Sequence, residues 1–185
     1  MTRGQVRQRM VASAALLLAE KGPTGASVGD VLSAAAAPKG STYHHFPGGK
    51  RELYAEALQL AGWRADAAMA RVNTRSPITV VDGFFGMWRA LLDQSELRLG
   101  CAVLSVAVAG EDRESIDLAG AVFSAWRDRL TGLFVDAGLP KGRAKKLAAL
   151  TIASAEGGVA IARAEGSTAA FELVASQMHD IARGL

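Results

Sequence analysis

The sequence is poor in the residues that build disulfides, loops and sheets. Among 185 residues there are one cysteine and five prolines, and aromatic residues make up 6%. A single cysteine excludes an internal disulfide framework and a cysteine-based zinc cluster. So few prolines argue against long disordered stretches. Because β-branched and aromatic residues are sparse while alanine, leucine and arginine dominate, the composition favours an all-α protein.

Long uncharged apolar runs are also missing. A bilayer-spanning helix needs about 18 or more such residues, and the longest candidate run is interrupted by Glu156, Gly157 and Gly158. The first 20 residues carry scattered charges and no cleavage-like site of a signal peptide. These features predict a cytoplasmic protein with no membrane partner.

Positive charge is concentrated at the N-terminal end. The net charge of the chain is +3. Residues 1–50 carry six Lys or Arg against two Asp or Glu, a balance of +4, and the remainder carries 15 against 16, a balance of −1. This distribution predicts that only the N-terminal part meets a polyanion.

Hydrophobic residues at helical spacing predict about nine helices. Ser27 and Asp30 have the spacing of an N-terminal capping box, and Pro38 is expected to open a third short helix. We expect a helix-turn-helix domain of three helices over residues 1–50 and a second helical domain over 51–185. The expected helices cover 5–21, a short segment after Ser27, 39–46, 50–73, 77–92, 101–108, 113–137, 140–163 and 169–182.

The segment 27–50, SVGDVLSAAAAPKGSTYHHFPGGK, predicts two short helices joined by a tight turn. This is the pattern of a helix-turn-helix, whose second helix lies in the DNA major groove. Here that helix is rich in side chains that hydrogen-bond to nucleic acid. We expect positioning contacts to the duplex from Ser27, Tyr43, His44 and Lys50, and contacts to base edges from Lys39, Gly40, Ser41 and His45.

The sequence offers little for metal binding or catalysis. His44 and His45 are neighbours on a predicted helix, so their side chains point about 100° apart and cannot bind one ion. His179 is the only other histidine, and no nucleophile and base stand at a catalytic spacing. We therefore expect no metal, no cofactor and no enzymatic activity.

Aromatic residues are concentrated in the middle helices, where they form either ordinary core or the walls of an apolar ligand cavity. Glu156 lies in an apolar run and is either a hydrogen-bonded pocket residue or a group at a helix end. Cys101 has no adjacent basic residue to lower its pKa, which favours a buried inert thiol over a redox sensor. The candidate ligand-binding residues are Trp63, Phe84, Phe85, Trp88, Cys101, Leu104, Phe123, Trp126 and Glu156.

The last two predicted helices favour a homodimer. Residues 147–164 are rich in Ala, Gly and Ser, which lets helices approach closely. With the apolar residues of the final helix they suit a four-helix bundle between two subunits, and packing within one chain is the alternative. The candidate dimerisation residues are Leu147, Thr151, Ile152, Ala155, Val159, Phe171, Val174 and Met178.

The pattern A-x-x-KGS-x-YHHFPGGK resembles that of the TetR family of transcriptional repressors, and within it the LmrA/YxaF-like branch. The stretch 100–103, GCAV, is similar to a GCPV-like stretch of that branch. The resemblance implies a dimer that binds a palindromic double-stranded DNA operator and is released by a small hydrophobic or aromatic ligand. It implies DNA contacts at Ser27, Lys39, Gly40, Ser41, Tyr43, His44 and Lys50.

Three residues depart from the family pattern. Ala36 stands where the turn usually has glycine, Pro38 where the recognition helix usually has a serine cap, and Thr42 where a large apolar residue usually points inward. The alternative function is a helical small-molecule-binding protein without DNA binding. That alternative would explain the aromatic middle but not the basic, hydroxyl-rich third helix.

Overall fold

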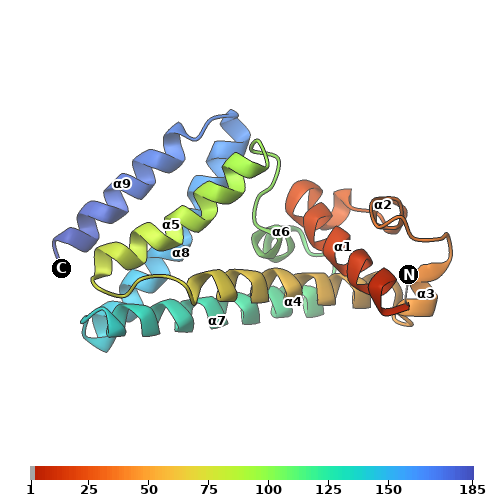
Figure 1. The fold of residues 1–185 in the computed structure, drawn as a ribbon, viewed down its shortest axis with the longest axis horizontal. Coiled ribbons are helices and arrows are strands. Elements are labelled where there is room, and N and C mark those ends of the chain that lie inside the picture. The colour runs from red at the N-terminus through yellow and green to blue at the C-terminus, as the bar shows by residue number, and fades with distance from the viewer. Residues whose placement is uncertain (1–2) are drawn as a thin grey trace. The chain divides into compact units, whose positions relative to one another are not determined.

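The computed structural model describes residues 3–185, and this part of the chain is built from nine α-helices without a strand (Figure 1). The prediction of an all-α protein is confirmed. In order, the helices are α1 (Arg3–Gly25), α2 (Val28–Ala34), α3 (Ser41–His45), α4 (Gly49–Met69), α5 (Pro77–Gln94), α6 (Ala102–Ala109), α7 (Arg113–Asp136), α8 (Lys141–Glu165) and α9 (Ala169–Arg183).

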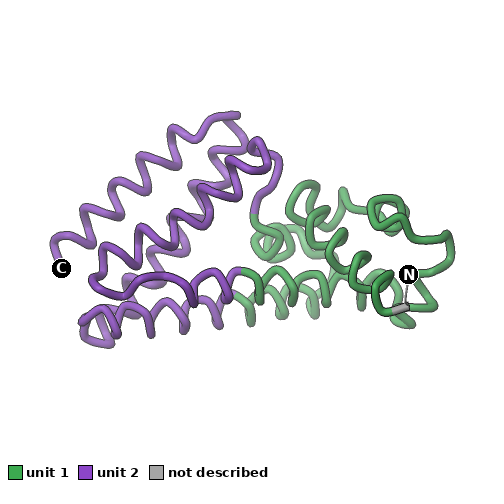
Figure 2. The backbone as a smooth tube through the Cα atoms, in the orientation of Figure 1, with its two compact units in different colours: residues 1–64, 101–122 green, residues 65–100, 123–185 purple. Residues whose placement is uncertain are grey.

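The helices form two compact units (Figure 2). The N-terminal unit consists of the chain up to Arg64 together with Cys101–Val122, and the C-terminal unit consists of Ala65–Gly100 and Phe123–Leu185. The boundary between them therefore falls within α4 and α7. The predicted domain boundary at residue 50 stays a prediction.

The core of the N-terminal unit is the apolar face of α1. Met10, Ala14 and Leu18 are fully buried, as their helical spacing predicts, and α1 packs against α6 and α2. Burying one such large side chain is worth about 1.5–3 kcal/mol. The hydroxyl of Ser105 on α6 also donates a hydrogen bond to the backbone carbonyl of Leu18 (3.0 Å).

Helix α1 continues beyond its predicted end, but not as a regular helix. Gly22 has left-handed backbone angles (φ 71°), and one further turn with Pro23 follows it to Gly25. Glycine adopts this conformation without the steric penalty of a Cβ. The regular part of α1 thus stops where the sequence predicts, and the extra turn leads into α2.

In the C-terminal unit α5, α8 and α9 pack against one another. Helix α5 begins at residue 77, as the sequence predicts, with Pro77 in its first turn and Ser76 capping it through a capping box with Thr79. The rings of Phe85 and Phe171 lie 5.5 Å apart between α5 and α9. A Cβ at Gly158 of α8 would lie 3.1 Å from the Phe171 ring, so glycine permits this close approach.

Helix α8 is long and apolar enough to cross a membrane when judged by length and composition alone. Half of its most apolar window is buried within the unit. Its apolar side chains are in part accounted for by contacts within its own chain.

Candidate nucleic-acid interface

Helix α2 begins with the predicted capping box. The Ser27 hydroxyl accepts a hydrogen bond from the Asp30 backbone N–H (3.0 Å), and the Asp30 carboxylate accepts from the backbone N–H (3.1 Å) and the hydroxyl (2.7 Å) of Ser27. The hydrogen bond from the Ser27 hydroxyl has the largest effect in lowering the pKa of Asp30, and the bond from the Ser27 backbone N–H lowers it further. Ser27 is exposed, but its donors are already paired with Asp30. A phosphate contact by Ser27 would therefore have to replace Asp30.

The turn after α2 is a Schellman motif with alanine in the position that favours glycine. The N–H of Ala37 bonds to the Leu32 carbonyl (2.9 Å) and that of Ala36 to the Ser33 carbonyl (3.1 Å). Ala36 has φ 45°, so it tolerates its Cβ in the left-handed conformation, at a cost of roughly 1 kcal/mol. The turn keeps its geometry despite the departure from the family pattern.

Helix α3 begins at Ser41, two residues later than predicted. Gly40 is its N-cap residue and has left-handed angles (φ 89°), which exclude it and the preceding Lys39 from the helix. Both the N–H and the hydroxyl of Ser41 donate to the Pro38 carbonyl (3.1 and 2.5 Å). The prediction that Pro38 opens the helix is therefore wrong, because Pro38 belongs to the preceding turn.

The exposed face of residues 39–45, the end of the turn together with α3, carries most of the predicted DNA-binding residues. Lys39, Gly40, Tyr43 and His44 are exposed, and 76% of Tyr43 is accessible. Ser41 and His45 are half-buried at its edges. Thr42 points inward and is 4% exposed, so it occupies the core position that the family gives to a larger apolar residue. The turn and α3 thus bring six predicted residues to one side of the unit.

Arg7, which the sequence analysis missed, fixes the C-terminal end of α3. Its guanidinium binds both carboxylate oxygens of Glu56 on α4, one at 2.6 Å, and its Nε donates to the His45 carbonyl (3.3 Å). The same group lies 4.7 Å from the ring centre of Phe46. Arg7 is separated from these partners by 38 or more positions, so no local pattern reveals the contact.

Tyr54 of α4 fixes the start of α2. Its hydroxyl donates to the Ala26 carbonyl (2.7 Å) in the connection between α1 and α2. Burial raises the pKa of Tyr54 to about 12. Two residues, Arg7 and Tyr54, therefore hold the two helices of the helix-turn-helix onto α1 and α4.

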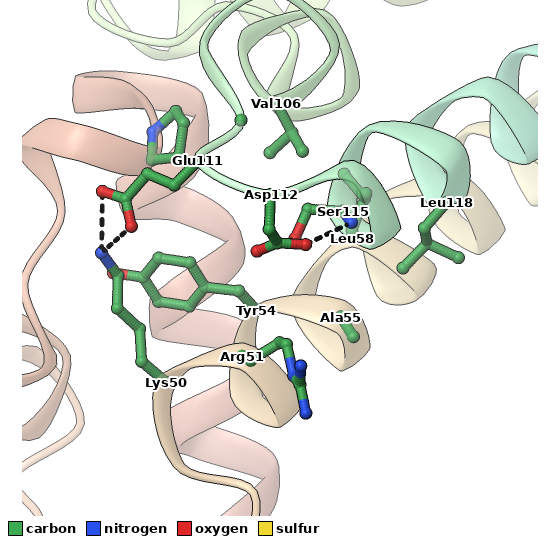
Figure 3. Close-up of a pocket in the computed structure, with 12 residues that line it drawn as sticks. Lys50, Arg51, Tyr54, Ala55, Leu58, Val106, Glu111, Asp112, Ser115 and Leu118 are labelled. Carbon is green, nitrogen blue, oxygen red and sulfur yellow. Dashed lines mark hydrogen bonds and ion pairs between the residues drawn. The ribbon is translucent and has the colours of Figure 1, made fainter.

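Lys50 lies in the first turn of α4 (Figure 3), which follows α3 after a short connection. Its ammonium is 3.3 Å from both carboxylate oxygens of Glu111 and 5.3 Å from the ring centre of Tyr54. The predicted phosphate-binding lysine is thus half-exposed and already paired with a carboxylate of its own unit.

The predicted ligand-binding residues are divided between the two units. Trp63 is 67% exposed on α4, and Cys101 caps α6 by accepting a hydrogen bond from the Leu104 N–H (3.3 Å) in the N-terminal unit. The other residues belong to the C-terminal unit: Phe84, Phe85, Trp88, Phe123, Trp126 and Glu156. Cys101 is buried, as predicted for an inert thiol.

In the C-terminal unit three of these aromatic side chains form one cluster. The rings of Trp88 and Phe123 each meet Trp126 edge to face, at centroid distances of 6.5 and 5.5 Å. The Trp88 indole N–H is buried and has no hydrogen-bond partner among the described residues. Glu156 on α8 is 5% exposed. The aromatic residues of α5 and α7 are therefore brought together, and this cluster contains the buried indole N–H of Trp88.

The predicted dimerisation residues lie mostly inside the C-terminal unit. Seven of the eight are buried by their own chain, and Val174 is half-buried. Packing within the chain, the alternative stated from the sequence, is compatible with this burial, and the assignment of these residues to a dimer interface stays a prediction. Other apolar side chains are exposed elsewhere on the same helices. The exposed apolar side chains there include Leu150 and Ile161 on α8, each 43% exposed, and Leu173 on α9, 73% exposed.

Two short helices joined by a tight turn, with polar side chains exposed on the second, define a helix-turn-helix DNA-binding protein. Residues 11–57 match the family model for bacterial regulatory proteins of the tetR family. Residues 77–177 match the model for the C-terminal domain of LmrA/YxaF-like transcriptional regulators. The chain therefore belongs to the TetR family of transcriptional regulators, which are not enzymes.

Similar proteins agree with this assignment. An uncharacterized HTH-type transcriptional regulator of Mycobacterium tuberculosis H37Rv is 36% identical over 183 residues, covering 95% of this chain and 93% of the relative. YxaF of Bacillus subtilis, also an HTH-type transcriptional regulator, is 23% identical over 98% of this chain and 97% of its own length. A TetR transcriptional regulator from Legionella pneumophila has the same fold, with a TM-score of 0.84 at 23% identity over 94% of this chain and 95% of that one.

Proposed function

We propose that this protein is a cytoplasmic transcriptional repressor that binds a palindromic operator as a homodimer and is released by a small hydrophobic or aromatic ligand. The observation that carries the proposal is the exposed polar face of α3 and its preceding turn. Arg7 holds the end of α3, and Tyr54 holds the start of α2, the other helix of the motif. A side chain must be exposed to reach a base edge, and a rigid support keeps it in register with the groove.

The proposed roles follow the placement of each side chain. Lys39, Gly40 and Ser41 precede or begin α3 and face base edges, as the first residues of a recognition helix do. Tyr43, His44 and Lys50 contact phosphates on either side. His45 supports the end of the helix more than it reads DNA, because it is half-buried and its carbonyl is bound by Arg7.

The exposed apolar side chains of α8 and α9 support the homodimer. Between Leu150 and Ile161 the outward face of α8 carries only small residues: Ala153, Gly157 and Ala160. Two such faces can approach closely and bury the larger side chains at either end. The dimer face proposed here consists of exposed residues, whereas most of the residues selected from the sequence are buried in their own chain.

Replacing Leu150 with Asp tests this face. The variant should sediment as a monomer where the wild type is a dimer, because one carboxylate per subunit would be desolvated in the interface. Val108→Asp is the control, since Val108 is 79% exposed on α6 in the other unit. An unchanged dimer for Leu150→Asp would exclude this face as the interface.

The aromatic cluster in the C-terminal unit supports the ligand response. A buried N–H without an acceptor costs about 1–3 kcal/mol, and the Trp88 indole is such a group. An aromatic ligand with a hydrogen-bond acceptor would both stack on these rings and satisfy that donor. It could release DNA only by binding the DNA-free conformation more tightly than the DNA-bound one.

A gel-shift titration with DNA adjacent to the protein's own gene tests the proposed function. We expect a specific complex that weakens when uncharged aromatic compounds from a panel are added, with quenching of tryptophan fluorescence by the same compounds. No shift on any adjacent fragment would contradict the repressor assignment. A shift that no compound affects, together with no fluorescence change, would remove the ligand response alone.

A further inference from the structure

The turn between α6 and α7 is acidic and lies against the first turn of α4 within the N-terminal unit (Figure 3). Glu111 binds Lys50, with 3.3 Å from Nζ to both carboxylate oxygens. Glu114 binds Arg51 at 3.4 Å. Two consecutive cations beside α3 are thus neutralised by two carboxylates from a segment about 60 positions away.

The third acidic residue of this region, Asp112, is bound to the first turn of α7. Asp112 precedes α7 and accepts hydrogen bonds from the backbone N–H (2.8 Å) and the hydroxyl (3.1 Å) of Ser115 in the first turn of that helix. The backbone bond from Ser115 is the largest cause that lowers the pKa of Asp112. Asp112 is therefore held at the start of α7, although the charge of Arg51 on α4 also helps to lower its pKa. Glu111 and Glu114 are the carboxylates of this region that form ion pairs with α4.

The backbone of the turn passes close to the end of α6 at Gly110. A Cβ at Gly110 would lie 2.6 Å from the Val106 carbonyl oxygen and 3.0 Å from the Ile116 side chain. Only glycine therefore allows the chain to turn this tightly. Beneath the turn lies a cavity of about 160 Å³, with Tyr54, Leu58 and Leu118 in its wall. The two ion pairs connect the turn and the start of α7 to α4 beside this cavity.

We propose that Glu111 competes with DNA phosphate for Lys50, and Glu114 for Arg51, so that the acidic turn lowers the affinity of the protein for any duplex. This inference rests on the proposed function, in which Lys50 contacts a phosphate. A phosphate that approaches Lys50 must displace the carboxylate or share the ammonium with it, and the two anions repel each other. Exposed ion pairs are worth at most about 1 kcal/mol, which converts to an affinity penalty of up to about fivefold for each pair.

The test needs no knowledge of the operator, because phosphate contacts are independent of sequence. The probe is a fluorescein-labelled duplex of arbitrary sequence, about 24 base pairs long, titrated at about 50 mM salt. Glu111→Gln should bind it about two- to fivefold more tightly than the wild type. The difference should shrink as salt rises, because screening weakens the competing ion pair.

Asp117→Asn is the matched control. It removes the same charge from the same segment, but Asp117 pairs with Arg113 one turn along α7 (2.8 Å) and has no ion pair with α4. Its effect on affinity should be less than half that of Glu111→Gln. Equal gains in the two variants would mean that net charge alone explains the effect, and the proposal would be overturned.

The Lys50→Gln background makes the test specific to the pair. In this background Glu111→Gln should no longer raise affinity, and a persistent gain would overturn the proposal. The proposal would also be overturned if the Glu111→Gln protein has the melting temperature of the wild type but binds the duplex no more tightly. If the wild type binds no duplex at all, including fragments adjacent to its gene, the proposed function fails. If it binds but Glu111→Gln has no effect, only this inference fails.

Discussion

Replacing Arg7 with Met should weaken sequence-specific DNA binding more than nonspecific DNA binding. Arg7 makes a two-pronged ion pair with Glu56, a hydrogen bond to the His45 carbonyl and a contact over the Phe46 ring. Methionine keeps the aliphatic packing but removes all three polar contacts. The end of α3 then loses the contacts through which Arg7 connects it to α1 and α4, and the exposed side chains of α3 lose their fixed orientation.

The magnitude follows from the geometry. The Arg7 side chain is 40% exposed, so the ion pair is worth about 1 kcal/mol. The cation–π contact adds about 0.5 kcal/mol and the long hydrogen bond a similar amount, for a total of about 2 kcal/mol. In a chain of this length, that loss lowers the midpoint of thermal unfolding by roughly 4–8 °C.

The assay combines thermal unfolding with DNA titrations of an operator fragment and an arbitrary duplex. Arg7→Met should lose affinity for the operator about tenfold and for the arbitrary duplex less than about threefold, because phosphate contacts tolerate reorientation better than base contacts. Arg129→Met is the control, since Arg129 makes a similar two-pronged pair with Asp66 (2.9 and 3.1 Å) in the C-terminal unit. An unchanged ratio of the two affinities in Arg7→Met would refute the positioning role.

Two further predictions concern the elements that hold the helix-turn-helix. Ala36→Gly should raise the free energy of unfolding by about 0.5 kcal/mol, because it relieves the left-handed strain at φ 45°; a lower melting temperature would contradict this. Tyr54→Phe should cost about 1–2 kcal/mol near neutral pH, because the Ala26 carbonyl loses its donor. The pKa of Tyr54 is raised to about 12 in the folded protein, so its stabilisation is complete below the ordinary value near 10 and is lost as pH rises through 12. The difference in denaturant midpoint between wild type and Tyr54→Phe should therefore narrow above about pH 10, and a constant difference would argue against the shifted pKa.

Local signals predicted the helices well. Ser27 was expected to cap one short helix and residue 77 to begin another, and both helices start there, with Ser27 and Ser76 as N-cap residues of capping boxes. Such caps are readable because every partner lies within three residues. The start of α3 was less predictable, since Pro38 suits both a first helical turn and a preceding turn. The left-handed Gly40, which decides between them, has no signature beyond being glycine.

Long-range contacts explain what the sequence could not reveal. The partners of Arg7 and Lys50 lie 38 to 61 positions away, and helical periodicity carries no information about such pairs. The candidate dimer residues are mostly buried in their own chain for a different reason. Periodicity identifies an apolar face, and in α8 that face is the buried one. The outward face carries mostly alanine and glycine, and the hydrophobic pattern of the sequence does not show whether such small residues are buried or exposed.

The most direct measurement is a titration of an operator fragment and an arbitrary duplex with the Lys39→Gln protein. If the exposed face of α3 and its turn reads base edges, this variant should lose about 1–3 kcal/mol of operator affinity, with little change for the arbitrary duplex. Lys145→Gln, which removes an exposed lysine from α8, should match the wild type on both. Equal behaviour of the two variants on the operator would contradict the account.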